Sequence, residues 1–148
     1  MIRRAYANEL EGIADRLSRI SLLTTDLERV NKEFAAARIL LALERSQVWV
    51  DYWREDIQRV VYIEEKRPNV GQVHAFWFNG YPRRAIIKQA LFECGFIRVL
   101  AYVPEYAAPI ADWLIRKIGF LDSGTPSRIW WRGQKWPVFE LLWTVQNT

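Results

Sequence analysis

The chain has 148 residues, of which 51% are hydrophobic and 26% charged. This composition is typical of a folded globular protein and excludes a disordered one, and the length predicts a single domain over residues 1–148. No apolar run reaches the ~18–20 residues of a membrane span, and the first residues lack the apolar core of a signal peptide. Cys94 and His74 are the only residues of their types, which excludes an internal disulfide and a structural zinc site. We therefore expect a protein of the cytoplasm without metal or membrane contact.

The formal net charge of +4 arises wholly in the second half of the chain. Residues 71–148 hold 9 basic and 5 acidic residues, whereas residues 1–70 hold 12 of each. An excess of this kind favours an anionic partner, such as a phosphate-bearing cofactor, a nucleic acid or an acidic protein. A charge this small can also serve solubility alone.

The first half of the chain predicts a strand followed by two helices. The strand covers residues 2–6. Asn8 and Glu11 have capping-box spacing and open the first helix, and Thr25 and Glu28 repeat this signal before a second helix that runs to about residue 44. The second helix is expected to bury a stripe of residues spaced three and four apart: Leu27, Val30, Phe34, Ala37 and Leu41.

The period of the pattern then changes from helical to alternating. Residues 48–53, 60–63 and 72–78 are rich in aromatic and β-branched side chains and are separated by turn residues. Three such runs in succession predict an antiparallel meander.

The remaining elements alternate between helices and strands. Pro82 suits the first turn of a helix, whose expected apolar stripe is Ile87, Ala90, Leu91 and Cys94. Residues 96–103 are nearly all apolar and predict a central strand. Pro109 opens a further helix that Gly119 ends, and a final hairpin pairs residues 129–131 with 138–143. The fold class is therefore α+β: a mixed, mostly antiparallel sheet flanked by about four helices.

Three segments of the chain carry a resemblance to a known family. IRRAYANELEGIADRL at residues 2–17 is similar to the first strand and helix of the GNAT superfamily, the acetyl-CoA-dependent N-acetyltransferases. NGYPRRAIIKQAL at residues 79–91 lies where that family has its pyrophosphate loop. APIADWLIRKIGF at residues 108–120 resembles the family's last helix and its Gly-Phe exit. The resemblance covers almost the whole chain and implies a GNAT-like domain.

Within the superfamily, the chain most resembles the short GNAT-like proteins of tailed bacteriophages. The likeness lies in Val103-Pro104 before the last helix, in Gly119-Phe120 after it, and in the aromatic hairpin that follows. It implies a protein of the bacterial host cytoplasm, with the phage virion as a second location.

The resemblance also implies where acetyl-CoA binds. Its pyrophosphate would lie against backbone N–H groups at the start of a helix, with Phe78, Gly80, Arg83, Arg84 and Ala85 as the cofactor-binding residues. The family pattern is Gln or Arg, two residues, Gly, one residue, then Gly or Ala. Only Ala85 matches it, because Arg83 stands at the glycine position. Arg83 and Arg84 could bind phosphate by charge instead, or they could be simply solvated.

The acid and base that acetyl transfer needs are not in the family's places. The tyrosine of the last helix is replaced by Ile115, the asparagine near its start by Ala108, and residues 71–79 contain no Glu or Asp. His74 is the candidate base, since its pKa class suits that role. Tyr102 is the candidate proton donor. Each could equally be a packing residue of its strand.

The last hairpin concentrates tryptophan beside arginine. Alternation places Trp130 and Trp131 on opposite faces, with Arg132 and Trp136 close by. Such a surface is typical of protein interfaces, so these four residues are the candidate interface. A stacking platform for single-stranded nucleic acid and a simple edge of the core are the alternatives.

Two functions from different classes remain. We favour a phage-type GNAT-like protein whose degenerate cofactor site leaves weak or no acetyl transfer, and which acts through a protein partner or as a homo-oligomer. The alternative is a working acetyl-CoA-dependent N-acetyltransferase that acts on a small amine or a protein amine. The cofactor is acetyl-CoA if the protein is active and none otherwise. Binding of nucleic acid is a less favoured third hypothesis.

Overall fold

The computed structural model describes residues 1–19, 32–131 and 134–145. Within them an open sheet of eight strands has the order β1-β2-β3-β4-β5-β8-β6, with β7 paired to β8. The strands are β1 Ile2–Arg4, β2 Gln47–Trp53, β3 Asp56–Arg67, β4 Val70–Trp77, β5 Arg98–Pro104, β6 Leu121–Asp122, β7 Ser127–Trp131 and β8 Gln134–Thr144. The α-helices are α1 Leu10–Ser18, α2 Lys32–Glu44, α3 Arg84–Glu93 and α4 Ala108–Trp113.

This architecture confirms the predicted fold class. Every strand pair is antiparallel except β4 with β5, so the sheet is mixed and mostly antiparallel. The meander of β2, β3 and β4 and the final hairpin of β7 and β8 are both present. The short strand β6, which pairs with β8, was not predicted.

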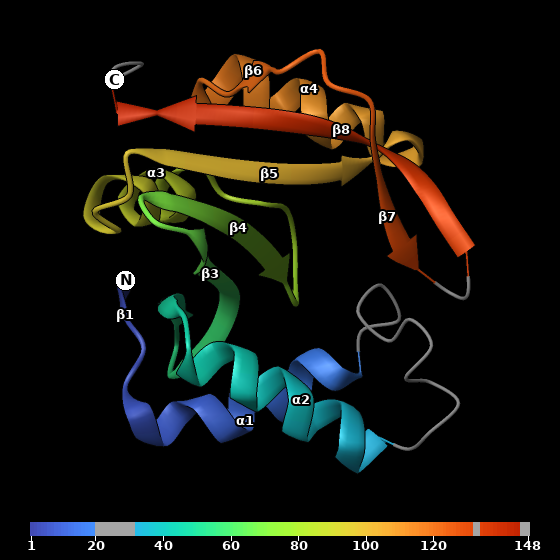
Figure 1. Cartoon of the computed structure of the whole chain (residues 1–148). Coiled ribbons are helices and arrows are strands. Elements are labelled where there is room, and N and C mark those ends of the chain that lie inside the picture. The colour runs from blue at the N-terminus through green and yellow to red at the C-terminus, as the bar shows by residue number, and fades with distance from the viewer. Residues whose placement is uncertain (20–31, 132–133, 146–148) are drawn as a thin grey trace.

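Each face of the sheet carries its own core (Figure 1). On one face α3 and the last helix cover a cluster that includes Ile87, Val99 and Leu141. On the other face α1 and α2 cover a second cluster that includes Leu17 and Val60. Alternate residues of each strand therefore point to different cores, and this decides on which face each candidate residue lies.

The start of the first helix differs from the expectation. A 3-10 turn, η1 (Ala7–Glu9), precedes α1, and Glu9 accepts a hydrogen bond from the Tyr6 backbone N–H at 2.7 Å. The capping carboxylate is therefore Glu9 and not Glu11, because the turn begins before Asn8 can act as the cap. Arg3 holds the same carboxylate at 2.7 Å, and this hydrogen bond lowers the pKa of Glu9.

The buried stripe of α2 was also predicted wrongly. Its buried or packed side chains are Ala35, Ile39, Leu40 and Leu43. Ala37 and Leu41 of the predicted stripe are exposed. The segment is apolar around most of its circumference, so its periodicity fits several registers and packing on the sheet selects one. The predicted cap at Thr25 and Glu28 lies outside the described residues.

The helices of the second half follow the prediction more closely. The stripe of α3 is buried as expected, although the helix begins at Arg84, two residues after Pro82. The last helix continues past α4 as a π-helix, η4 (Leu114–Ile118). Gly119 ends it in the left-handed region at φ 105°, which is favourable for a glycine.

The two central strands separate within the sheet. β4 and β5 are parallel neighbours for three successive residue pairs, from Val70 with Arg98 to Gln72 with Leu100. Beyond these pairs β4 stays on β3, and β5 stays on β8. Figure 1 shows β4 turning away from β5 toward its carboxyl end. We use the word opening for this divergence of the two backbones beyond Gln72 and Leu100.

Gly71 lies in the short stretch where the two strands are paired. A Cβ atom at this position would be 2.6 Å from the Ile63 side chain and 2.7 Å from the Phe96 ring. We predict that Gly71→Ala lowers the free energy of unfolding by ~1–3 kcal/mol through overpacking.

Urea unfolding measures this loss, and Gly12→Ala is the matched control. Nothing lies within 4 Å of a Cβ at Gly12. That variant should therefore gain about 0.5–1 kcal/mol from helix propensity. Equal effects of the two substitutions would contradict the packing around Gly71.

Candidate functional site

The opening between β4 and β5 brings the two candidate catalytic residues to one face of the sheet. His74 is two residues beyond Gln72, and Tyr102 is two residues beyond Leu100, the last pair of the parallel ladder. Val73 and Ala75 pack on the α3 side, and so does Ala101. His74 and Tyr102 therefore point to the opposite side, which α1 and α2 cover in part, and they flank the opening from its two strands.

His74 is held by two neighbours on β3. Its Nε2 atom lies 2.8 Å from Oε1 of Glu64. Its ring stacks on Tyr62 at a centroid distance of 4.5 Å and an interplanar angle of 16°. The hydrogen bond from His74 lowers the pKa of Glu64, while burial raises the pKa of Tyr62. Because an ionised carboxylate can only accept hydrogen bonds, Nε2 of His74 is the donor to Glu64, and Nδ1 is the ring nitrogen that Glu64 does not contact.

Tyr102 contacts a lysine that reaches across from β3. The Nζ atom of Lys66 donates a hydrogen bond to the Tyr102 hydroxyl and lies 4.2 Å from the centroid of its ring. On the far side, Tyr102 is opposite Glu140 of β8, which accepts a hydrogen bond of 2.8 Å from Ser127. The face beside the opening therefore carries an imidazole, a phenol, an ammonium group and two carboxylates.

Glu64 and Lys66 were not predicted from the sequence as site residues. A signal was present, because alternation places Tyr62, Glu64 and Lys66 on one face of the strand. The predicted strand ended at Ile63, one residue before Glu64 and three residues before Lys66. β3 continues to Arg67 by pairing with β4.

The loop before α3 has the features of an anion site. Gly80 has φ 75°, and α3 then begins at Arg84 with no side-chain cap. The first N–H groups of a helix have no partner within it, and the dipole there is positive. Arg84 and Ala85 are both exposed on this first turn. Phe78 lies elsewhere, on the side of α1, with the guanidinium carbon of Arg16 3.8 Å from its ring centroid.

Arg83 is directed away from the helix by a buried carboxylate. Asp51 of β2 has only 2% of its surface exposed and lies 3.2 Å from Nη1 of Arg83 and 3.1 Å from Nη1 of Arg59. Arg59 also donates a hydrogen bond of 2.7 Å to the backbone oxygen of Tyr81. Asp51, Arg59 and Arg83 line a pocket of about 290 Å³ together with Tyr52 and Gly80.

The candidate interface of the last hairpin lies largely outside the described part of the chain. This holds for Arg132 and for the side chains of Trp130 and Trp131. Trp136 is half-buried, and the ring of Tyr106 meets it edge-on at a centroid distance of 6.2 Å.

Two further observations concern Cys94 and the length of the helices. Cys94 is buried as expected, and burial raises the pKa of its thiol. None of the helices within the described residues is long and apolar enough to span a lipid bilayer.

Similar solved structures identify the fold. No family model matches the sequence, and no curated protein is similar to it. Among solved structures, a ribosomal-protein-alanine N-acetyltransferase from Brucella melitensis has a TM-score of 0.73 at 16% identity, covering 98% of this chain and 99% of that one. A GNAT-family acetyltransferase from Streptococcus pneumoniae has a TM-score of 0.71 at 16% identity, covering 98% of both chains.

A third similar structure was determined with a ligand. This protein from Salmonella typhimurium, named as an acetyltransferase, was solved with its cofactor acetyl-CoA. Its TM-score is 0.71 at 12% identity, and the match covers 98% of this chain and 93% of that one. The chain therefore has the GNAT fold of N-acetyltransferases, as its sequence predicted. Identities this low establish the fold alone.

The buried carboxylate gives a prediction about stability. We expect Asp51→Ala to lower the free energy of unfolding by about 3 kcal/mol, because it leaves the guanidinium of Arg59 partly buried without its counter-charge. Urea unfolding followed by tryptophan fluorescence measures the loss.

Asp56→Ala is the matched control for Asp51→Ala. The ion pair of Asp56 with Arg16 is exposed, with 57% of the Asp56 side chain accessible. Loss of an exposed pair should cost less than about 1 kcal/mol. Similar losses of unfolding free energy in the two variants would show that the ion pairs of Asp51 stabilise the fold no more than an exposed pair does.

Proposed function

We propose that the protein is an acetyl-CoA-dependent N-acetyltransferase. The observation that carries this proposal is the opening between β4 and β5, with His74 and Tyr102 at equivalent places on its two sides. A proton acceptor and a proton donor at the mouth of one opening are what acyl transfer to an amine requires. Fold alone would not support the proposal, because one fold can host many functions.

Acetyl-CoA, when bound, supplies the acetyl thioester. The exposed first turn of α3 fits its pyrophosphate, since the turn offers unpartnered N–H groups and the guanidinium of Arg84. Gly80 and Ala85 keep the approach to this backbone free of large side chains. Pro82 lacks an N–H group, but it precedes the helix and removes none of these donors.

The residues beside the opening divide the proton transfers between them. Nδ1 of His74 accepts a proton from the acceptor amine while Glu64 holds the ring through Nε2. The hydroxyl of Tyr102 gives a proton to the leaving thiolate, and the ammonium of Lys66 stabilises the negative charge that this transfer leaves on the phenol oxygen. His74 therefore acts as the base, since residues 71–79 contain no carboxylate that could do so.

The acceptor proposed is a primary amine of a small molecule or of a protein. Similar structures are named for alanine of ribosomal proteins and for spermidine. Both acceptors carry an aliphatic amine, and both belong in a first panel of substrates.

The phage-type protein with little or no transfer activity, which the sequence alone favoured, is the second proposal. Large exposed side chains favour surface contacts, among them Trp53, Tyr81 and Phe92 at 63%, 81% and 82% exposure. It predicts a stable protein partner or a homo-oligomer in the host cytoplasm or in the virion. Binding of nucleic acid, the third hypothesis, predicts an affinity that falls steeply with salt.

Calorimetric titration with acetyl-CoA, followed by assay of thiol release, tests the first proposal. We expect one site per chain and transfer to an amine of the panel. His74→Ala and Tyr102→Phe should each lower kcat by about 10²–10⁴-fold, because each removes a group that moves a proton. Their affinities for acetyl-CoA should stay unchanged.

Glu11→Gln on the exposed side of α1 is the matched control and should keep wild-type kcat. No binding at millimolar acetyl-CoA would overturn the transferase proposal and leave the protein-contact proposal. Full activity of both His74→Ala and Tyr102→Phe would overturn the assignment of their roles.

The cofactor site gives a separate prediction. Arg84→Ala should raise the Kd of acetyl-CoA by about tenfold, since it removes a charge-assisted hydrogen bond to phosphate. Arg83→Ala should change the Kd much less, because Asp51 already holds that guanidinium. Lys88→Ala, on an exposed position one turn further along α3, is the control that measures loss of charge alone. A larger effect of Arg83→Ala than of Arg84→Ala would overturn this division of roles.

A further inference from the structure

We propose that Lys66 is a self-acetylation site: the protein transfers an acetyl group from acetyl-CoA to the Nζ atom of its own Lys66. This inference rests on the proposed transferase function. The amine is the side chain of Lys66, which lies on the face of the sheet from which an acceptor amine must approach.

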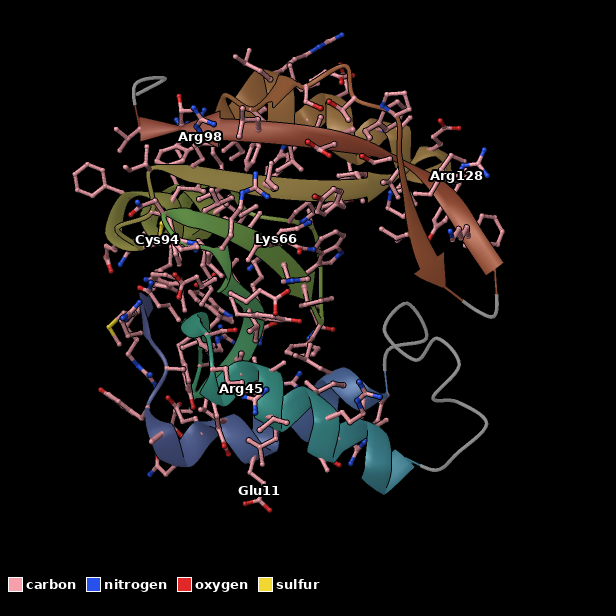
Figure 2. The ribbon with its side chains drawn as sticks, viewed as in Figure 1. Glu11, Arg45, Lys66, Cys94, Arg98 and Arg128 are labelled. Atoms are coloured by element: carbon pink, nitrogen blue, oxygen red, sulfur yellow. The ribbon has the colours of Figure 1, made fainter. Side chains whose placement is uncertain are left out.

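The placement of Lys66 carries the inference. It extends from β3 over the neighbouring strand β4, and its Nζ atom reaches Tyr102 on β5, across the opening from His74. Figure 2 labels Lys66 among the side chains that lie over β4 next to β5. An acceptor amine has to approach the thioester from this face, because the α3 side holds the cofactor's phosphates in the proposed site.

The contacts of Lys66 lie within the proposed site. Among the described residues no carboxylate forms an ion pair with its Nζ atom. Its recorded partners are the hydroxyl and the ring of Tyr102, the proposed proton donor. The residue is exposed, so solvent can take up the proton that the ammonium loses.

The transfer balances without any further reactant. The Lys66 ammonium loses a proton to Nδ1 of His74 and thence to solvent, and its lone pair forms a C–N bond with the acetyl carbonyl carbon. The C–S bond breaks, and the thiolate takes a proton from Tyr102, which recovers it from the second proton of the attacking nitrogen. The products are Nζ-acetyl-Lys66, coenzyme A and one proton.

Acetylation of Lys66 would change the site that catalyses it. Acetylation replaces a charged group beside Tyr102 by a neutral and larger amide, which removes the charge that stabilises the phenol oxygen. Lys66 would then serve as a first acceptor that limits further transfer when no other amine occupies the face.

Mass spectrometry of the purified full-length protein incubated with acetyl-CoA tests the proposal. We expect one added acetyl group at Lys66, formed at least tenfold faster than acetylation of Lys88 and Lys117, which are exposed on helices outside the site. The rate per chain should not depend on protein concentration, since donor and acceptor belong to one molecule. Tyr102→Phe and His74→Ala should slow this modification and leave that of Lys88 and Lys117 unchanged.

Lys66→Arg keeps the charge and removes the acceptor nitrogen, so it separates this modification from all others. Thiol release without an added amine should be lost in this variant. The proposal is overturned if Lys66 is acetylated no faster than Lys88 and Lys117 while the protein acetylates spermidine, a result that leaves the transferase function standing. It is overturned together with that function if the protein neither binds acetyl-CoA nor releases thiol with any amine.

Discussion

The separation of β4 from β5 is the constraint on which the rest of the structure depends. Because β4 and β5 pair for only three residues, their facing edges have no ladder between them beyond Gln72 and Leu100. The sheet tolerates this because each strand is secured on its outer side, β4 by β3 and β5 by β8. Close packing of Phe96 and Ile63 around Gly71 holds the short paired stretch together. The opening therefore follows from the pairing of each strand with its outer neighbour.

The opening also separates the chemistry of the two faces. On the α3 face, backbone N–H groups and Arg84 provide positive charge at a helix N-terminus, which suits phosphates. On the other face, the two residues proposed to transfer protons each contact a residue of β3: His74 contacts Glu64, and Tyr102 contacts Lys66. One strand thus positions both sides of the proposed reaction, because its alternate residues project over β4 toward the opening.

Much of this arrangement could be predicted from the sequence. Local signals such as the alternating runs of the meander, the stripe of α3 and Gly119 predicted the elements. Two kinds of feature could not be predicted. The register of α2 is one, since its sequence is apolar around most of the helix and only packing selects Leu43 over Leu41. The partners of His74 and Tyr102 are the other, because they depend on pairing across strands.

Asp51 gives a physical reason why the proposed cofactor loop can depart from the family pattern. A glycine at the place of Arg83 would keep the backbone bare, and an arginine there would obstruct it if its side chain lay over the first turn of α3. Asp51 prevents this, because a carboxylate with 2% exposure needs a counter-charge and draws the guanidinium of Arg83 down to itself beside Arg59. The same pairing that satisfies the buried charge therefore clears the start of the helix. Arg83 at the glycine position suggests, in the sequence alone, that the phosphate site has been lost. In the fold, the ion pair with Asp51 keeps the Arg83 side chain from covering the backbone there.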